Sequence, residues 1–82
     1  MNLTELKIKL QEIGISELAY SFAGGLPNEA YCLTKTDSGW EIYYSERGNK
    51  NGLKKFVNEQ DACDYFFSTL TEDSTVMENL ER

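Results

Sequence analysis

The side chains of this chain that could do acid–base chemistry are carboxylates, because the sequence contains no histidine. Glu41 and Glu46 are the pair to consider first, since two carboxyl groups can serve as general acid and general base in hydrolysis. Their odd separation puts them on opposite faces of a regular strand, and only a bulge would bring them together. The alternative is a catalyst built from carboxylates and tyrosines alone. We therefore expect no enzymatic activity.

The sequence offers equally little for a cofactor or a metal. Gly24 and Gly25 are adjacent, but no Lys-Ser/Thr pair follows them as it does in a phosphate-binding loop. Cys32 and Cys63 lie far apart in the sequence, without a histidine to complete a zinc site. We expect both cysteines to be reduced, buried thiols, and we expect no cofactor and no metal.

The segment from Trp40 to Gly48 is the most informative part of the chain, because it combines large aromatics with an acid and a base. Strand alternation separates its side chains into two faces: Trp40, Ile42, Tyr44 and Glu46 on one, and Glu41, Tyr43, Ser45 and Arg47 on the other. We expect the Trp40 face to pack in the core. Tyrosine and arginine are enriched at interfaces, so the other face predicts a binding surface with Tyr43 and Arg47 as contacts. In the alternative interpretation, Glu46 pairs with Lys54 or Lys55 across the hairpin, and Arg47 donates hydrogen bonds to carbonyl oxygens of the turn.

Charge is distributed unevenly over the 82 residues, which carry a net charge of −6. The first 56 residues hold seven acids and seven bases, whereas the remainder holds seven acids and one base. Acidic surfaces repel nucleic-acid phosphates and attract basic protein faces. We therefore expect a protein partner and no nucleic acid, with contacts from Glu59, Asp61 and Asp64 on a predicted helix. A solvated face that keeps a small protein soluble is the plain alternative.

Local patterns predict an α+β fold, an antiparallel sheet of about four strands packed with an N-terminal and a C-terminal helix in the order α-β-β-β-β-α. A capping-box pattern at Asn2 and Glu5 starts the first helix, which ends at Gly14. Strands are predicted at 18–22, 30–36, 40–47 and 53–57, with a turn at 48–52. Asn58 is a good N-cap for the second helix.

Residues 1–82 form a single predicted domain, since a chain of this length has room for one core. Residues 71–82 are either a loosely held acidic tail or a short helix capped by Thr75 and Glu78. The first residues do not resemble an export signal, and no segment approaches the roughly 18 apolar residues of a membrane span. We expect a cytoplasmic protein that does not bind membranes.

This order of elements resembles that of the small immunity proteins of bacterial polymorphic toxin systems, which act between contacting cells. The resemblance covers roughly residues 14–70 and rests on Gly24-Gly25-Leu26-Pro27, on the string from Trp40 to Gly48, on Phe56 and on Ala62-Cys63. It implies a stoichiometric inhibitor that binds and neutralises a cognate toxin domain, without catalytic residues or cofactor. The acid excess suits a basic toxin such as a nuclease. The alternative is a non-catalytic adaptor, or a structural module that self-associates as a homodimer.

Overall fold

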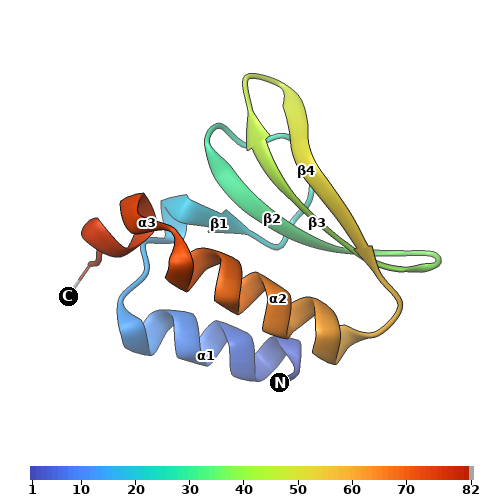
Figure 1. The fold of residues 1–82 in the computed structure, drawn as a ribbon, viewed down its shortest axis with the longest axis horizontal. Coiled ribbons are helices and arrows are strands. Elements are labelled where there is room, and N and C mark those ends of the chain that lie inside the picture. Colours follow the sequence, from blue (N-terminus) through green and yellow to red (C-terminus); the bar gives the residue numbers. More distant parts are fainter. Residues whose placement is uncertain (82) are drawn as a thin grey trace.

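A computed structural model describes residues 1–81, which form one mixed sheet with its helices on one side (Figure 1). The elements follow one another along the chain as α1 (Leu3–Ile13), a 3-10 turn η1 (Glu17–Ala19), β1 (Tyr20–Ser21), β2 (Ala30–Thr36), β3 (Gly39–Glu46), β4 (Asn49–Phe56), α2 (Glu59–Glu72) and α3 (Ser74–Glu78). The predicted α+β fold of four strands with helices at both ends is therefore confirmed.

The strands lie in the order β1-β2-β3-β4, so each is next to its neighbour in the sequence. The pairs β2–β3 and β3–β4 are antiparallel, as predicted. The pair β1–β2 is parallel, with Tyr20 opposite Tyr31, where an antiparallel pair was expected. The reason is the segment 22–29, a connection that is not a tight hairpin turn and that brings β2 back in the same direction as β1.

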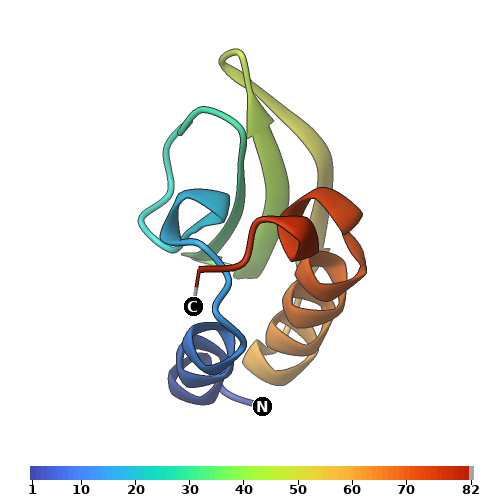
Figure 2. The ribbon, with the colours of Figure 1, turned by 90° about the vertical axis from the view of Figure 1, so that its left-hand side faces the viewer.

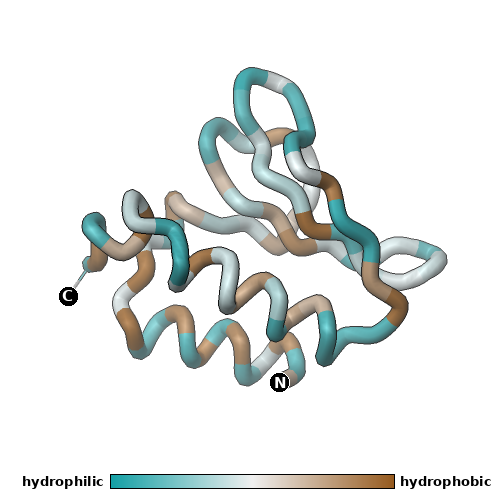
Figure 3. Tube along the Cα trace, in the orientation of Figure 1, coloured by the Kyte–Doolittle hydropathy of each residue, from teal (hydrophilic) through white to brown (hydrophobic). Residues whose placement is uncertain are grey.

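One hydrophobic core lies between the sheet and the two long helices, which run side by side beneath it (Figures 1 and 2). Helix α2 contacts β2, β3 and β4, and α1 packs along α2. Figure 3 shows hydrophobic residues interspersed along the two long helices and the strands, and hydrophilic residues at the tip of the β3–β4 hairpin. The fully buried members are Leu6, Leu10, Leu33, Ala62, Cys63, Phe66 and Leu70, and Ile15 and Ile42 are nearly so.

The starts of α1 and α2 follow their predicted capping residues. Asn2 and Glu5 form a complete capping box at α1, and Asn58 accepts a 2.8 Å hydrogen bond from the amide of Asp61 at the start of α2. Over the described residues, the end of the chain forms the short helix α3, not a loose tail. Its N-cap is Asp73, which accepts hydrogen bonds from the Thr75 and Val76 amides, so the prediction of Thr75 as the cap was wrong.

The second hairpin turns earlier than predicted. Its tip is Arg47–Gly48, where both residues have positive φ, as a two-residue turn of type I′ requires. Strand β4 consequently begins at Asn49, within the segment predicted as a turn. Opposite Tyr43, β4 carries two residues, Gly52 and Leu53, so the register shifts there through a bulge.

Candidate functional site

Tyr43, the predicted interface contact, is buried on the face of the sheet that points away from the helices. Its side chain is only 2% exposed, and its hydroxyl donates a 2.7 Å hydrogen bond to the carbonyl oxygen of Gly25. Burial, with the nearby Cys32 thiol and Glu41, raises the pKa of Tyr43 to about 12. The expectation that this face is presented to a partner was wrong at Tyr43, because part of the loop 22–29 lies across it.

The glycine pair predicted as a turn makes this cover feasible. Gly24 and Gly25 have φ of +76° and +74°, values that other residues adopt only with strain. A Cβ on Gly24 would lie 3.5 Å from the side chain of Thr34, so the loop runs close against the sheet. Under it lie Ala30, Cys32 and Ser45, all buried, which makes a small second core on the far face.

Both cysteines are free and buried, as predicted. Burial raises the pKa of each thiol, which keeps it protonated and unreactive at neutral pH. Cys32 belongs to the far-face core and Cys63 to the main core, so the sheet separates them.

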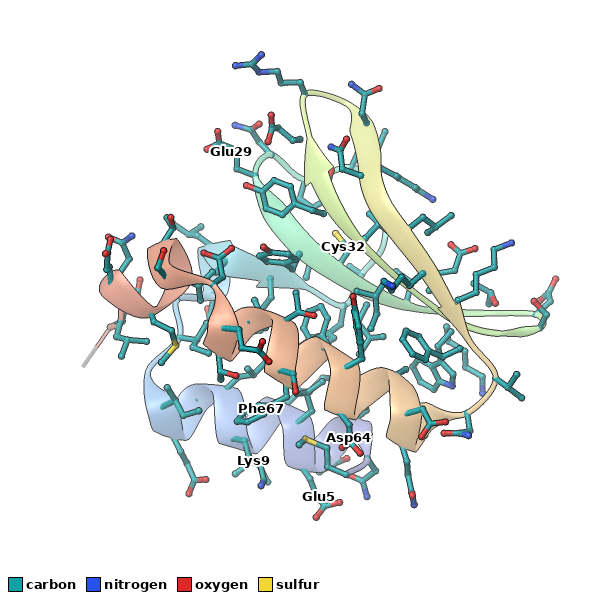
Figure 4. The ribbon with its side chains drawn as sticks, viewed as in Figure 1. Glu5, Lys9, Glu29, Cys32, Asp64 and Phe67 are labelled. Atoms are coloured by element: carbon teal, nitrogen blue, oxygen red, sulfur yellow. The ribbon has the colours of Figure 1, made fainter. Side chains whose placement is uncertain are left out.

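The predicted acids of α2 make contacts within the molecule. Glu59 accepts a 2.7 Å hydrogen bond from the amide of Leu3, Asp61 accepts one of 3.0 Å from Asn58, and Asp64 lies 3.1 Å from the amino group of Met1. The contacts of Glu59 and Asp64 join the N-terminal ends of α1 and α2, whereas that of Asp61 is local to the start of α2. Figure 4 shows Asp64 beside α1, far from Glu29 at the start of β2.

The five predicted contacts are therefore not brought together. Arg47 is exposed at the hairpin tip, Tyr43 is under the loop, and the three acids lie at the start of α2. Within the described residues, these five side chains therefore do not form one continuous surface that a partner could contact.

A different group of side chains lines an open hollow of about 380 Å³ between η1, the sheet and α3. Pockets that bind small molecules commonly start at about 300 Å³. We call this hollow the tyrosine groove and define it by Leu18, Glu29, Tyr31, Tyr44, Asp73 and Val76, which all line it. Ser16, Ala19, Thr75 and Asn79 complete its lining.

Two tyrosines on paired positions of β2 and β3 form the wall of the groove. The ring centroids of Tyr31 and Tyr44 are 4.7 Å apart, with an interplanar angle of 60°. The hydroxyl of Tyr31 donates a 2.5 Å hydrogen bond to Asp73. Tyr44 was expected in the core together with Trp40. Both are half-buried; Trp40 packs against the core, whereas Tyr44 lines the groove.

The groove has a negative electrostatic environment. Burial raises the pKa of Tyr44, and the carboxylates of Glu29, Glu46 and Asp73 raise it further. Burial raises the pKa of the neighbouring Tyr20 as well, with Glu17 and Glu81 adding to it. No lysine or arginine within residues 1–81 lines the groove.

The lysines of the molecule cover other rings. Within 6 Å of an aromatic centroid lie five lysine amino groups, those of Lys7 over Phe22, Lys9 over Phe67, Lys35 over Trp40, Lys50 over Tyr43 and Lys54 over Tyr65. Figure 4 shows Lys9 beside Phe67 on the outside of the helix pair. Neither Tyr31 nor Tyr44 has such a cation among the described residues, although both line an acidic hollow.

Two further features mark the groove. Glu29 has a φ of +52°, a left-handed conformation that is strained for a glutamate, and strain of this kind is concentrated at functional sites. Leu18, which is 84% exposed, adds an apolar side chain to the lining of the groove. A second hollow of about 340 Å³ begins on the other side of Tyr31 and Tyr44 and runs to Tyr65 and Thr69 of α2. The two tyrosines thus lie between two adjoining hollows.

This arrangement suits binding better than proton transfer. Burial and the hydrogen bond to Asp73 raise the pKa of Tyr31, while that hydrogen bond lowers the pKa of Asp73. At neutral pH the tyrosine therefore stays protonated and the aspartate stays ionised, and neither can exchange a proton readily. Among residues 1–81 there is no cluster of histidine, cysteine or acidic residues that could hold a metal ion.

Sequence reasoning missed the groove because its residues come from distant segments. One available signal was parity, since Tyr31 alternates with the buried Cys32 and so shares a face with Leu33 and Tyr44. No pattern in the sequence indicated that α3 would lie next to that face.

Comparison with known proteins gave no relative: no family model, no curated protein and no solved structure matches the chain. No helix within residues 1–81 has the length and apolar character needed to cross a membrane.

Proposed function

We propose that the protein is an immunity protein, a non-catalytic binder that neutralises a cognate bacterial toxin domain by holding a basic surface of that toxin against the tyrosine groove. The observation that carries this proposal is the groove itself, where half-buried tyrosines, carboxyl side chains and an exposed leucine meet in one hollow. Tyrosines in such positions supply much of the binding energy in protein interfaces. The resemblance noted from the sequence supports the same class.

A basic partner follows from the charges around the groove. Its carboxylates lie on a protein of net charge −6, so an acidic protein would be repelled and a cationic surface attracted. Nucleases carry basic surfaces where they bind phosphates, which makes a nuclease domain a suitable toxin.

The alternative of a homodimer formed through the exposed face of the sheet has less support, because the loop at Gly25 lies against Tyr43 on that face, and pairing through the edge of the sheet is opposed as well. β4 is the long edge strand of the sheet, and it carries Lys50, Lys54, Lys55 and the bulge at Gly52–Leu53. Lysines and bulges on an edge strand oppose pairing with the edge of a second molecule.

The test compares two exposed apolar residues at different places on the molecule. Leu18 in the groove is 84% exposed and Val57, which follows β4, is 88% exposed, so serine at either position should leave the fold intact. We expect Leu18→Ser to weaken binding of the toxin encoded by the adjacent gene about tenfold or more, corresponding to roughly 1.4 kcal/mol, and to reduce protection of cells that express the toxin.

Val57→Ser should bind and protect as the unmodified protein does. The proposal fails if the adjacent gene product does not bind the protein. It also fails if Val57→Ser abolishes protection while Leu18→Ser retains it, because the contact would then lie away from the groove.

A further inference from the structure

The hydrogen bonds around the groove distinguish its two carboxylates. Asp73 is occupied within the molecule: one oxygen accepts from the Tyr31 hydroxyl, and the other accepts from the amides of Thr75 and Val76. The side chain of Glu29 makes no hydrogen bond or ion pair within residues 1–81, and it is exposed at the groove. Glu29 is therefore the carboxylate with both oxygens available to a ligand, while Asp73 contributes charge.

The shape of the groove selects among cations. The Tyr31 and Tyr44 rings, at 60° to each other, offer aromatic surface next to the free carboxylate of Glu29. A guanidinium group is flat, stacks on an aromatic ring and donates two parallel hydrogen bonds to one carboxylate. An ammonium group can also lie over a ring, but it is compact and strongly hydrated, and it can neither stack flat on the ring nor donate two parallel hydrogen bonds in a fixed fork to one carboxylate.

We propose that the tyrosine groove accepts the guanidinium group of an arginine from the partner protein, stacked against Tyr44 and paired with Glu29. This inference rests on the proposed function and names the residue by which the partner is anchored. The carboxylates around Tyr44 favour a cation there, and no lysine or arginine among the described residues fills the position. The molecule itself places lysine ammonium groups over five other aromatic rings, so cations meet its aromatic rings elsewhere, while the flat stacking and the paired hydrogen bonds are what favour a guanidinium group in the groove.

The test uses small probes with the full chain, so that it does not depend on the toxin. Nuclear magnetic resonance of the isotope-labelled protein would follow titrations with N-acetyl-argininamide, its lysine counterpart and its citrulline counterpart, which is neutral but has nearly the same shape. We expect the arginine probe to give saturable shifts at Leu18, Glu29, Tyr31 and Tyr44. The lysine probe should bind at least threefold more weakly, and the citrulline probe should not saturate.

Two matched variants test the role of the carboxylate. Glu29→Gln should weaken binding of the arginine probe at least fivefold. Glu12→Gln removes the same charge from an exposed position on α1 and should change nothing. The inference is overturned if the citrulline probe binds as tightly as the arginine probe, or if Glu29→Gln binds the arginine probe as tightly as the unmodified protein does. It is also overturned if the shifts are centred on Glu59, Asp61 and Asp64.

The outcomes separate this inference from the proposed function. If the protein binds the toxin and Leu18→Ser weakens that binding, but the arginine probe gives no shifts, the function stands and the arginine anchor is wrong. If the probe binds with the expected selectivity and the toxin does not bind, the groove accepts arginine and the proposed function is wrong.

Discussion

The hydroxyl of Tyr31 and the carboxylate of Asp73, 42 positions apart in the sequence, are joined by a 2.5 Å hydrogen bond. Tyr31 belongs to β2, and Asp73 links α2 to α3 while capping α3. One side-chain contact therefore connects the sheet with the end of the helical layer. It also holds together two walls of the tyrosine groove.

Removal of this hydrogen bond should destabilise the fold. We expect Tyr31→Phe to lower the free energy of unfolding by about 1.5 kcal/mol, at the low end for a bond to a charged group because water can reach the freed Asp73. Urea denaturation measures this change. Tyr65→Phe removes a hydroxyl from a ring that is 37% exposed and should cost less than about 0.5 kcal/mol. Equal losses in the two variants would show that the Tyr31–Asp73 bond contributes nothing specific.

The same pair predicts a pH dependence of stability. The hydrogen bond from Tyr31 lowers the pKa of Asp73 against the opposing effect of burial, and the amides of Val76 and Thr75 lower it further. A depressed pKa in the folded state stabilises the protein above the unfolded value of about 3.9, and this contribution disappears as the pH falls through the folded pKa. Urea midpoints between about pH 5 and pH 2 should therefore fall less steeply for Tyr31→Phe than for the unmodified protein. Parallel curves would contradict the assignment.

Local patterns were sufficient to predict most of the fold. The capping box at Asn2 and Glu5 and the N-cap at Asn58 act within a few residues of the chain, so the sequence shows them directly. Strand parity likewise placed Ile42 toward the helices and Tyr43 away from them. The position of the second turn was wrong because Arg47 adopts a positive φ that its residue type does not favour.

The site could not be predicted by the same means. Parity shows which side chains share a face, but not which segment covers that face. The loop at Gly25 covers Tyr43, and the sheet near Tyr44 is left partly open. Both outcomes depend on contacts between distant segments, as the bond from Tyr31 to Asp73 also does.

Gly39, at the start of β3, lies too close to β4 to accept a side chain. It has a φ of +147°, and a Cβ there would overlap with the backbone carbonyl of Phe56. We expect Gly39→Ala to lower the free energy of unfolding by about 2–3 kcal/mol, since backbone must move to relieve the overlap. Gly48→Ala is the control, because its φ is also positive but nothing lies within 4 Å of the added Cβ. The free energy of unfolding of Gly48→Ala should fall by only about 1 kcal/mol. If that of Gly39→Ala falls by no more than this, the two strands move apart easily and the expectation is wrong.

Tyr43 should stabilise the loop over the far face of the sheet. We expect Tyr43→Phe, which removes the bond to Gly25 and keeps the ring, to cost about 1 kcal/mol. Hydrogen exchange should become faster in the segment 22–29 and stay unchanged in α2. Binding of the toxin should also stay unchanged, because the lining of the tyrosine groove does not include Tyr43. If Tyr43→Phe binds the toxin much more weakly while hydrogen exchange in the segment 22–29 is unchanged, Tyr43 contacts the toxin directly.

Glu29 and Arg47 allow stability and binding to be separated. Their φ values are almost equal, +52° and +51°, and both side chains are exposed. Glycine at either position relieves the strain of the left-handed conformation, worth about 1–2 kcal/mol, and loses some of that gain through its greater freedom in the unfolded chain. Glu29→Gly and Arg47→Gly should therefore both be as stable as the unmodified protein or slightly more stable in thermal or urea denaturation.

Their effects on binding should differ. Glu29→Gly removes the free carboxylate of the groove and should weaken toxin binding about tenfold or more, even though the variant is no less stable. Arg47→Gly removes a cation from the hairpin tip, so a basic partner should bind it as well as before, or slightly faster at low salt. Binding kinetics measured at low and physiological salt distinguish the two, because the screening length falls to about 8 Å at 0.15 M. If Arg47→Gly were the variant that loses binding, the contact surface would lie on the hairpin, as the sequence first predicted, and the strain at Glu29 would have no function in binding.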